Sequence, residues 1–183
     1  EKTRGKVAII GSGPAGLTVA GDLARQGFHV TIFEGQPEAG GVLMYGIPEY
    51  RLPKAVVRNE IKKIEDLGVH FVRNCLVGTP ESGVTVDSLF AEGFDAIFMG
   101  TGTALPQNLS IPGSDLRRVT QSTDFLHNVN AYVEGALPME MVPLRKGDKV
   151  AVIGGGNVAM DAARTARRLG ADVTVIYRRT QAE

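Results

Sequence analysis

The chain has 183 residues, 43% of them hydrophobic, and its 20 basic and 20 acidic side chains cancel to a net charge of zero. This composition predicts a folded, soluble domain structure, and the balanced charge argues against a general affinity for nucleic acid or anionic membranes. The single cysteine, Cys75, excludes an internal disulfide, a C-x-x-C redox pair and a cysteine-ligated metal or iron–sulfur site. No apolar run reaches the roughly 20 residues of a membrane helix and no signal peptide is visible, so a cytoplasmic location is expected.

One phrase occurs twice. Residues 6–35 align without a gap onto residues 149–178, with eleven identical positions. Each copy contains a short apolar run, a glycine turn, apolar residues at helical spacing, a glycine that ends the helix and a second apolar run. This is the pattern of a strand, a crossover helix and a parallel strand, with strands expected at residues 7–10, 30–33, 150–153 and 173–176. The repeat therefore predicts an α/β protein with two Rossmann-like, doubly wound dinucleotide-binding units.

The stretch between the copies continues the α/β pattern. Apolar spacing predicts a helix over residues 54–67, and two further apolar runs predict strands at residues 69–72 and 94–99. A helix is also expected after a cap at Ser122 or Thr123. We place a domain boundary near residue 118, which gives domains 1–118 and 119–183.

The second copy ends just beyond its second strand. We therefore expect the second domain to be incomplete and the chain, which starts with Glu rather than Met, to be a piece of a longer protein.

The first glycine turn, Gly11-x-Gly13-x-x-Gly16, has the spacing that suits a pyrophosphate. The first glycine permits the tight turn, the second lets the backbone approach the phosphates, and the third allows close packing of the helix. The helix N-terminus adds free N–H groups and a positive dipole end. Glu34 follows at the tip of the second strand, where a carboxylate accepts both ribose hydroxyls of an adenosine and repels a 2′-phosphate. FAD or NAD is favoured here, and the alternative is a solvated surface glutamate.

The second turn reads Gly154-x-Gly156-x-x-Ala159, and the position that matches Glu34 is Tyr177. Two guanidinium groups, Arg178 and Arg179, follow directly. Loss of the carboxylate and gain of two cations is the change that a 2′-phosphate requires, so NADP is favoured in this unit. The alternative is a solvated basic strand end.

The phrase "GGVLMYGIPEYRLPK" is too rich in glycine and proline for a helix. Close backbone approach at Gly40 and Gly41 fits a cofactor that lies against them, and Arg51 has the length to reach a phosphate. Structural turns alone explain the glycines equally well. No catalytic constellation and no metal site is visible, because the three histidines have no nucleophile or acid at useful spacing and hydride transfer between cofactors needs none.

The chain resembles the small, beta-type subunit of NADPH-dependent glutamate synthase and the flavin-binding portion of dihydropyrimidine dehydrogenase. The phrases "GSGPAG", "FEGQPEAGGVLMYGIPEYRLPK", "GTGTALP" and "VIGGGNVAMDAARTARRLGADVTVIYRR" carry the resemblance over nearly all of the chain. It implies an FAD domain interrupted by an NADPH domain, in a flavoprotein that passes a hydride from NADPH to FAD and electrons onward to iron–sulfur centres. The partner it implies is an iron–sulfur domain or a large catalytic subunit, and the piece alone is expected to be inactive.

The resemblance also implies site residues. Those at FAD are Gly11, Ser12, Gly13, Pro14, Ala15, Gly16, Glu34, Gly41, Val42, Arg51 and Val77. Those at NADPH are Gly155, Gly156, Asn157, Val158, Arg178 and Arg179. Two alternatives stay open: a dinucleotide-binding module without turnover, and another two-domain flavin reductase or monooxygenase.

Overall fold

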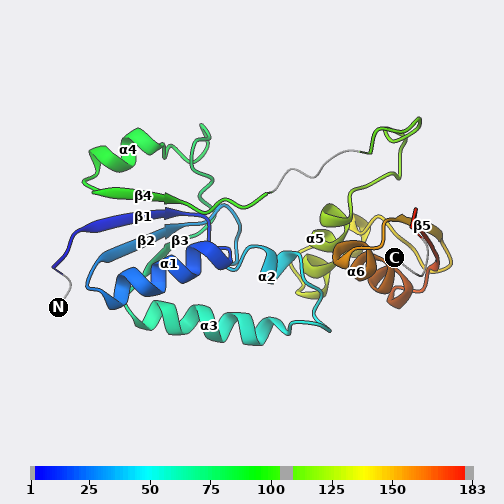
Figure 1. Cartoon of the computed structure of the whole chain (residues 1–183), viewed down its shortest axis with the longest axis horizontal. Coiled ribbons are helices and arrows are strands. Elements are labelled where there is room, and N and C mark those ends of the chain that lie inside the picture. The colour runs from blue at the N-terminus through cyan, green and yellow to red at the C-terminus, as the bar shows by residue number, and fades with distance from the viewer. Residues whose placement is uncertain (1–2, 104–108, 180–183) are drawn as a thin grey trace. The chain divides into compact units, whose positions relative to one another are not determined.

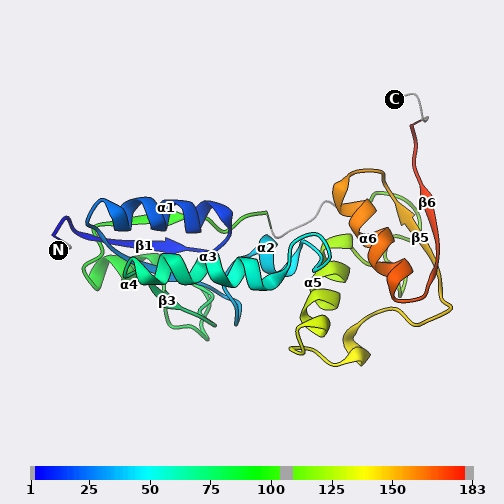
Figure 2. The same ribbon diagram turned by 90° about the horizontal axis from the view of Figure 1, so that it is seen from below.

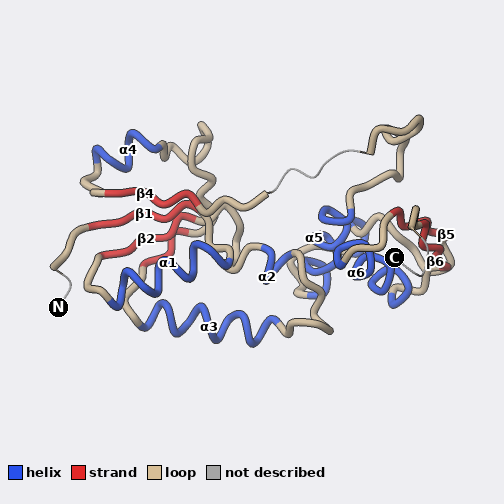
Figure 3. The backbone as a smooth tube through the Cα atoms, in the orientation of Figure 1, coloured by secondary structure: helices blue, strands red, loops and turns tan. Residues whose placement is uncertain are grey.

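The computed structural model describes residues 3–103 and 109–179. The chain folds as two compact units. A short segment that lies between the two stretches of unit 1 in the sequence belongs to unit 2. Unit 1 contains Glu1–Met44 and Leu52–Ala104, whereas unit 2 contains Tyr45–Arg51 and Leu105–Glu183. Each unit is built around one copy of the repeated phrase, as Figures 1 and 3 show.

Unit 1 is a four-stranded parallel sheet in the order β3-β2-β1-β4. The strands are β1 (Lys6–Ile10), β2 (His29–Phe33), β3 (His70–Val72) and β4 (Ala96–Met99). The helices are α1 (Pro14–Arg25), α2 (Val42–Tyr45), α3 (Lys54–Asp66) and α4 (Val86–Ala91). This order is the one expected for a doubly wound sheet, in which the crossover helix α1 links the two central strands.

Both faces of this sheet are covered, which explains the continuous apolar runs of its strands. Figure 2 shows α1 on one face and α4 on the other, and α3 packs against α1. One face carries a core of Ala8, Ile10, Phe33, Cys75, Leu89 and Phe94. On the other face, Ile9 and Ile32 are fully buried. The strand predictions at 7–10, 30–33, 69–72 and 94–99 and the helix prediction at 54–67 are confirmed to within two residues at each end.

Unit 2 contains a two-stranded parallel sheet, β5 (Lys149–Ile153) and β6 (Asp172–Ile176). It also contains α5 (Ser122–Val133), a 3₁₀ turn at Met139–Met141 and α6 (Asn157–Arg168). The two helices close over one face of the sheet around a core of Phe125, Leu126, Val129, Val142, Leu144, Ala162 and Ala166. Ile153 and Ile176 remain about half exposed on the described strands. The strand predictions at 150–153 and 173–176 are confirmed.

Two local expectations were wrong, and one helix was missed. The phrase after Gly41 was expected to be free of helix, but Val42–Tyr45 forms the single turn α2. The cap expected at Ser122 or Thr123 is Gln121, whose backbone is extended and whose side chain makes no capping bond. Helix α4 was not expected at all. It is held by a capping box, in which the Thr85 side chain accepts from the Ser88 N–H and the Ser88 side chain accepts from the Thr85 N–H, both at 3.0 Å.

Residues 109–118 lie within the compact unit 2, and the domain boundary near residue 118 stays a prediction. Arg118 is tied to this unit, because its guanidinium pairs at 2.7 Å with Asp148 of the same unit. The Arg145 main-chain N–H, with Arg118 beside it, holds the pKa of Asp148 below its usual value. Turn residues such as the "IPGSD" phrase thus lie inside a unit rather than between two.

Candidate functional site

The first glycine turn joins β1 to α1, and each of its three glycines has a specific structural environment. Gly11 has φ +98°, and a Cβ added to it would lie 2.5 Å from the Gly100 carbonyl oxygen, so only glycine fits. A Cβ on Gly16 would collide with the Gly11 carbonyl oxygen. At Gly13, the N-cap of α1, an added Cβ would meet nothing within 4 Å. The structure therefore leaves open space at the uncapped N-terminus of α1, as a phosphate cradle requires.

Glu34 is buried beside this turn. The residue is only 7% exposed, which rules out the alternative that Glu34 is a solvated surface glutamate. One carboxylate oxygen accepts hydrogen bonds from the Ser12 main-chain N–H at 3.0 Å and from the Ser12 hydroxyl, and the other accepts from the Gln36 N–H at 2.8 Å. A carboxylate offers about four acceptor positions, so these three donors orient Glu34 and leave acceptor capacity for a ligand hydroxyl.

The loop at Gly40 and Gly41 folds back onto the same turn. The Gly40 N–H donates to the Ser12 hydroxyl oxygen at 2.9 Å, and a Cβ on Gly41 would lie 2.9 Å from the Cα of Gly13. Val42, the next residue, is 55% exposed. The structure therefore brings Gly41 and Val42 to the glycine turn, whether or not a cofactor is bound.

The segment at Val77 also lies beside Glu34. The Cys75 N–H donates to the Glu34 carbonyl oxygen at 2.8 Å, and Leu76 packs against Gly35. Val77 itself is partly buried against the core of unit 1. The main chain at Val77 therefore runs close to the end of β2, where an adenine next to the Glu34-bound ribose would lie.

Arg51 has a different environment from the other expected FAD residues. It belongs to unit 2, where its guanidinium forms an ion pair at 2.5 Å with Asp161 of α6. The expected contact with a phosphate stays a prediction, and the observed partner of Arg51 is a carboxylate.

The second turn has the same backbone design and a different neighbour. Gly154 has φ +124°, and Gly156, the N-cap of α6, has open space where a Cβ would be. Gly155 is the counterpart of Ser12, and a Cβ on it would lie 2.8 Å from the Tyr177 ring. In unit 2 the Tyr177 ring therefore packs against Gly155, whereas in unit 1 the matching residues, Glu34 and Ser12, are joined by hydrogen bonds.

The other residues expected at NADPH lie at the open ends of this turn. Asn157 and Val158 begin α6 and are exposed. Arg178 and Arg179 directly follow Tyr177, are exposed, and make no ion pair with any other described residue. Two unpaired guanidinium groups at the tip of β6 are available to a dianionic phosphate.

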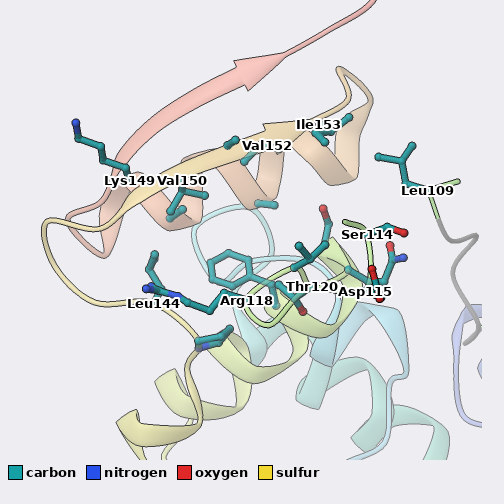
Figure 4. Close-up of a pocket in the computed structure, with 18 residues that line it drawn as sticks. Leu109, Ser114, Asp115, Arg118, Thr120, Leu144, Lys149, Val150, Val152 and Ile153 are labelled. Carbon is teal, nitrogen blue, oxygen red and sulfur yellow. The ribbon is translucent and has the colours of Figure 1, made fainter. Parts of the chain in front are cut away.

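Unit 2 also has a pocket of ≈ 840 Å³, shown in Figure 4. All five residues of β5 line it, together with Arg118, Thr120, Phe125 and Leu144 among others. Consecutive strand residues point to opposite faces, so the pocket follows the free edge of β5. In unit 1 the same edge of the matching strand, β1, is paired with β4. The pocket includes neither the second glycine turn nor Arg178 and Arg179, so it is separate from the expected nucleotide site.

Sequence reasoning missed Asp161. The available signal was a carboxylate at the position where the first copy has Thr18, on a helix face that is otherwise buried. Within residues 3–103 and 109–179 no group of three His, Cys, Asp or Glu side chains is placed to hold a metal ion. In the same ranges no helix has both the length and the apolar character to cross a bilayer.

Comparison with known proteins places these features in a family. The model of pyridine nucleotide-disulphide oxidoreductases matches residues 5–183. The chain belongs to this family. It is 45% identical over 181 residues to the NADP(+)-dependent formate dehydrogenase subunit beta of Moorella thermoacetica, covering 97% of this chain and 24% of that protein. It is 41% identical over 179 residues to the glutamate synthase [NADPH] small chain of Halomonas elongata, covering 96% of this chain and 37% of that protein.

A solved structure agrees with the fold. FprA from Mycobacterium tuberculosis, in a complex with NADPH, superimposes with a TM-score of 0.74 and 26% identity, over 97% of this chain and 44% of FprA. These comparisons confirm two predictions from the sequence. One is the similarity to the glutamate synthase small chain, and the other is the α/β fold with dinucleotide-binding units. The chain spans less than half the length of each of these proteins.

Proposed function

We propose that the protein containing this chain is an NADPH-dependent flavoprotein oxidoreductase, in which unit 1 binds FAD and unit 2 binds NADPH. The observation that carries the proposal is the contrast between two matched positions. In unit 1 the buried Glu34 is oriented by Ser12, whereas in unit 2 its counterpart Tyr177 packs on Gly155 and precedes two arginines that form no ion pair within residues 3–103 and 109–179. The first arrangement selects an unmodified adenosine ribose, and the second selects a 2′-phosphate.

The residues of unit 1 fit FAD. The open N-terminus of α1 at Gly13 supplies main-chain N–H donors for a pyrophosphate, and Glu34 accepts ribose hydroxyls at the end of β2. The Gly40–Gly41 loop covers this turn through the Ser12 hydroxyl. FAD, when bound, supplies the acceptor for the hydride that NADPH donates and passes the electrons on.

The residues of unit 2 fit NADPH. The uncapped N-terminus of α6, at Gly156, is open for the pyrophosphate, and Arg178 and Arg179 provide positive charge for the 2′-phosphate. Relatives named for NADPH and a relative named for NADH, the glutamate synthase of Schizosaccharomyces pombe, both match this chain. The choice of NADPH therefore rests on the two arginines rather than on family membership.

Electrons leave the flavin, in this proposal, for iron–sulfur centres on another domain or on a larger subunit. Two observations support such a partner. Relatives that match over nearly the whole chain are named as a subunit and as a small chain, and Cys75 is the only cysteine here. The acceptor centres therefore lie outside these 183 residues.

The test uses the full-length protein. The purified protein should show flavin absorbance near about 450 nm, a property of the bound cofactor. Under anaerobic conditions NADPH should bleach this band at a concentration at least about tenfold below that of NADH. A colourless protein that takes up no added FAD would refute the assignment of unit 1. Equal bleaching by both nucleotides would refute the assignment of unit 2.

A further inference from the structure

The segment Tyr45–Arg51 is held on unit 2 although the chain on both sides of it belongs to unit 1. The Asn130 side-chain amide of α5 donates to the Tyr45 carbonyl oxygen at 2.8 Å and to the Ile47 carbonyl oxygen at 3.3 Å. The Tyr45 ring stacks on His127 with ring centroids 4.7 Å apart. Asn130 is only 4% exposed, so its two bonds replace water that the buried amide would otherwise need.

Asp161 holds the other end of the segment. One carboxylate oxygen accepts from the Arg51 guanidinium at 2.5 Å, and the other accepts from Arg164 at 3.3 Å. The Tyr50 hydroxyl donates to the Asp161 carbonyl oxygen at 3.4 Å, and the Arg168 guanidinium lies 4.0 Å from the Tyr50 ring centroid. Three of these four contacts involve Asp161. We call the set of Tyr50, Arg51, Asp161 and Arg168 the clasp.

Burial gives the clasp its importance. The Asp161 side chain is 6% exposed, while that of Arg51 is 43% exposed. Removal of the partner of a buried charge is strongly unfavourable, because the remaining ion is then neither hydrated nor paired. Loss of Arg51 therefore leaves Asp161 with Arg164 alone, and loss of the Asp161 charge frees Arg51 and loosens the Arg51 end of the segment, while Asn130 still holds the Tyr45 end.

The segment is short and begins close to the first glycine turn. Gly41 contacts Gly13, and only Val42–Met44 separate it from Tyr45. Leu43 within this stretch is held from unit 1, because the buried Lys54 ammonium donates to its carbonyl oxygen at 3.0 Å. At the other end, Asp161 is the fifth residue of α6, one turn after the open N-terminus at Gly156.

We propose that Asp161 is a positioning residue, whose carboxylate holds Arg51 and thereby fixes segment 45–51 on the helix that we assign to NADPH. The inference rests on the proposed function and deepens it. The segment is covalently joined to the loop that covers the FAD turn, so the clasp restrains the chain between the two nucleotide sites. Hydride transfer is very sensitive to placement, since an error of 1 Å costs as much as about a hundredfold in rate.

The first readout is the rate of flavin reduction by saturating NADPH in stopped flow, measured on the full-length protein. Asp161→Asn should lower this rate at least about tenfold, with the NADPH dissociation constant and the flavin content within about twofold of the wild type. Arg51→Ala should act in the same direction, and Arg51→Lys should recover part of the rate. The double variant should be no slower than the slower single variant, because both changes break one contact.

Asp148→Asn is the matched control. Asp148 is also a carboxylate of unit 2 paired with an arginine, Arg118, but it makes no contact with segment 45–51 in the described structure. It should leave the reduction rate within about twofold of the wild type. A similar loss in Asp148→Asn and Asp161→Asn would overturn the inference, since it would show that any broken ion pair of unit 2 has this effect.

The second readout needs no turnover. Hydrogen exchange of peptides that cover residues 45–51 should become faster in Asp161→Asn and in Arg51→Ala, and should stay unchanged in Asp148→Asn. Peptides from α3 should not change in any variant. Unchanged exchange over 45–51 in both clasp variants would overturn the inference. The Arg51 side chain is about half exposed, so we expect its variants to fold. The exchange of residues 45–51 is then measured in Arg51→Ala if Asp161→Asn does not fold.

The two proposals fail in different ways. If NADPH does not reduce a flavin in the wild type, the proposed function is wrong, and hydrogen exchange still decides whether Asp161 holds the segment. If NADPH reduces the flavin equally fast in the wild type and in both clasp variants, the proposed function stands and the positioning role of Asp161 is wrong.

Discussion

Ser12 donates two hydrogen bonds to Glu34, one from its main-chain N–H and one from its hydroxyl. The matching pair in the second copy of the repeat is Gly155 and Tyr177, where a ring takes the place of the hydrogen bonds. The same backbone turn is thus combined with two different ends of the following strand. The nucleotide selectivity that we propose depends on this difference and not on the glycines, which both turns share.

Ser12→Ala should weaken FAD binding without unfolding unit 1. The substitution keeps the main-chain donor to Glu34 and removes the hydroxyl that joins Glu34 to the Gly40 N–H. Hydrogen bonds to charged groups are worth about 1.5–3 kcal/mol, so we expect an FAD dissociation constant raised about tenfold or more. Fluorescence titration of the deflavinated full-length protein measures it.

Thr18→Ala is the control for this change. Thr18 is exposed on α1 and donates only to the Pro14 carbonyl oxygen of its own helix. Its variant should bind FAD as the wild type does. Equal affinities in Ser12→Ala and the wild type would contradict a role of Ser12 in orienting Glu34.

Tyr177→Glu should turn unit 2 away from NADPH. The substitution puts a carboxylate at the position that Glu34 occupies in unit 1, and the carboxylate repels a 2′-phosphate while it accepts ribose hydroxyls. We expect the NADPH dissociation constant to rise about tenfold or more and that of NADH to change little or fall. Tyr177→Phe keeps the ring against Gly155 and should retain the preference of the wild type. Parallel weakening of both nucleotides in Tyr177→Glu would argue that the tyrosine serves only the fold.

Gly16→Ala and Gly21→Ala should have opposite effects on stability, although both glycines are buried on α1. A Cβ at Gly16 would collide with the Gly11 carbonyl oxygen. The shifts that such overpacking forces lower the free energy of unfolding by about 1–3 kcal/mol. A Cβ at Gly21 would come no nearer than 3.4 Å to the flexible Arg25 side chain. Alanine in a helix is favoured over glycine by about 0.5–1 kcal/mol.

Thermal denaturation of the full-length protein and of the two variants measures these changes in stability. The melting temperature should fall in Gly16→Ala and stay the same or rise in Gly21→Ala. A fall of equal size in both would mean that α1 tolerates no added methyl group, and that the contact with Gly11 is not the cause.

Cys75 should react slowly with thiol reagents in the folded protein. The residue is 7% exposed, and burial raises the pKa of its thiol. The reactive thiolate is therefore scarcer at pH 8 than for an exposed cysteine, and the reaction should accelerate as the pH rises toward the raised pKa. Iodoacetamide labelling, followed at the peptide that contains Cys75, should become much faster after denaturation. Rapid labelling of the native protein at pH 8 would contradict the burial of this thiol.

Much of the fold was predictable because the strands of a doubly wound parallel sheet read as continuous apolar runs, both in unit 1, where both faces are covered, and in unit 2, where helices cover one face. Strands β1, β2, β5 and β6 were found in this way, and the glycine after each first strand placed the turn. Helix α4 was missed because six residues are too few for a clear periodicity. Its capping box also uses Ser88 in place of the glutamate or glutamine that marks such boxes in a sequence.

The site was predictable where spacing along one copy of the repeat determines it, and not where distant residues meet. The position of Glu34 follows from the strand–turn–helix–strand pattern, but its burial and its bonds to Ser12 do not. The attachment of segment 45–51 to α5 and α6 depends on contacts across about 80 to 110 residues of sequence, such as Tyr50 with Asp161. No local pattern encodes these contacts, so neither the partner of Arg51 nor the role of Asp161 was visible in the sequence.

The division of two nucleotides between two turns is the central claim, and a crosswise comparison of two variants of the full-length protein tests it most directly. Flavin content and the NADPH dissociation constant are measured in Glu34→Gln and in Arg178→Ala/Arg179→Ala. We expect Glu34→Gln to lose flavin and to keep its NADPH affinity within about twofold, and the arginine variant to keep its flavin and bind NADPH at least about tenfold more weakly. Loss of NADPH affinity in Glu34→Gln with its flavin intact, or loss of flavin in the arginine variant with its NADPH affinity intact, would contradict the claim.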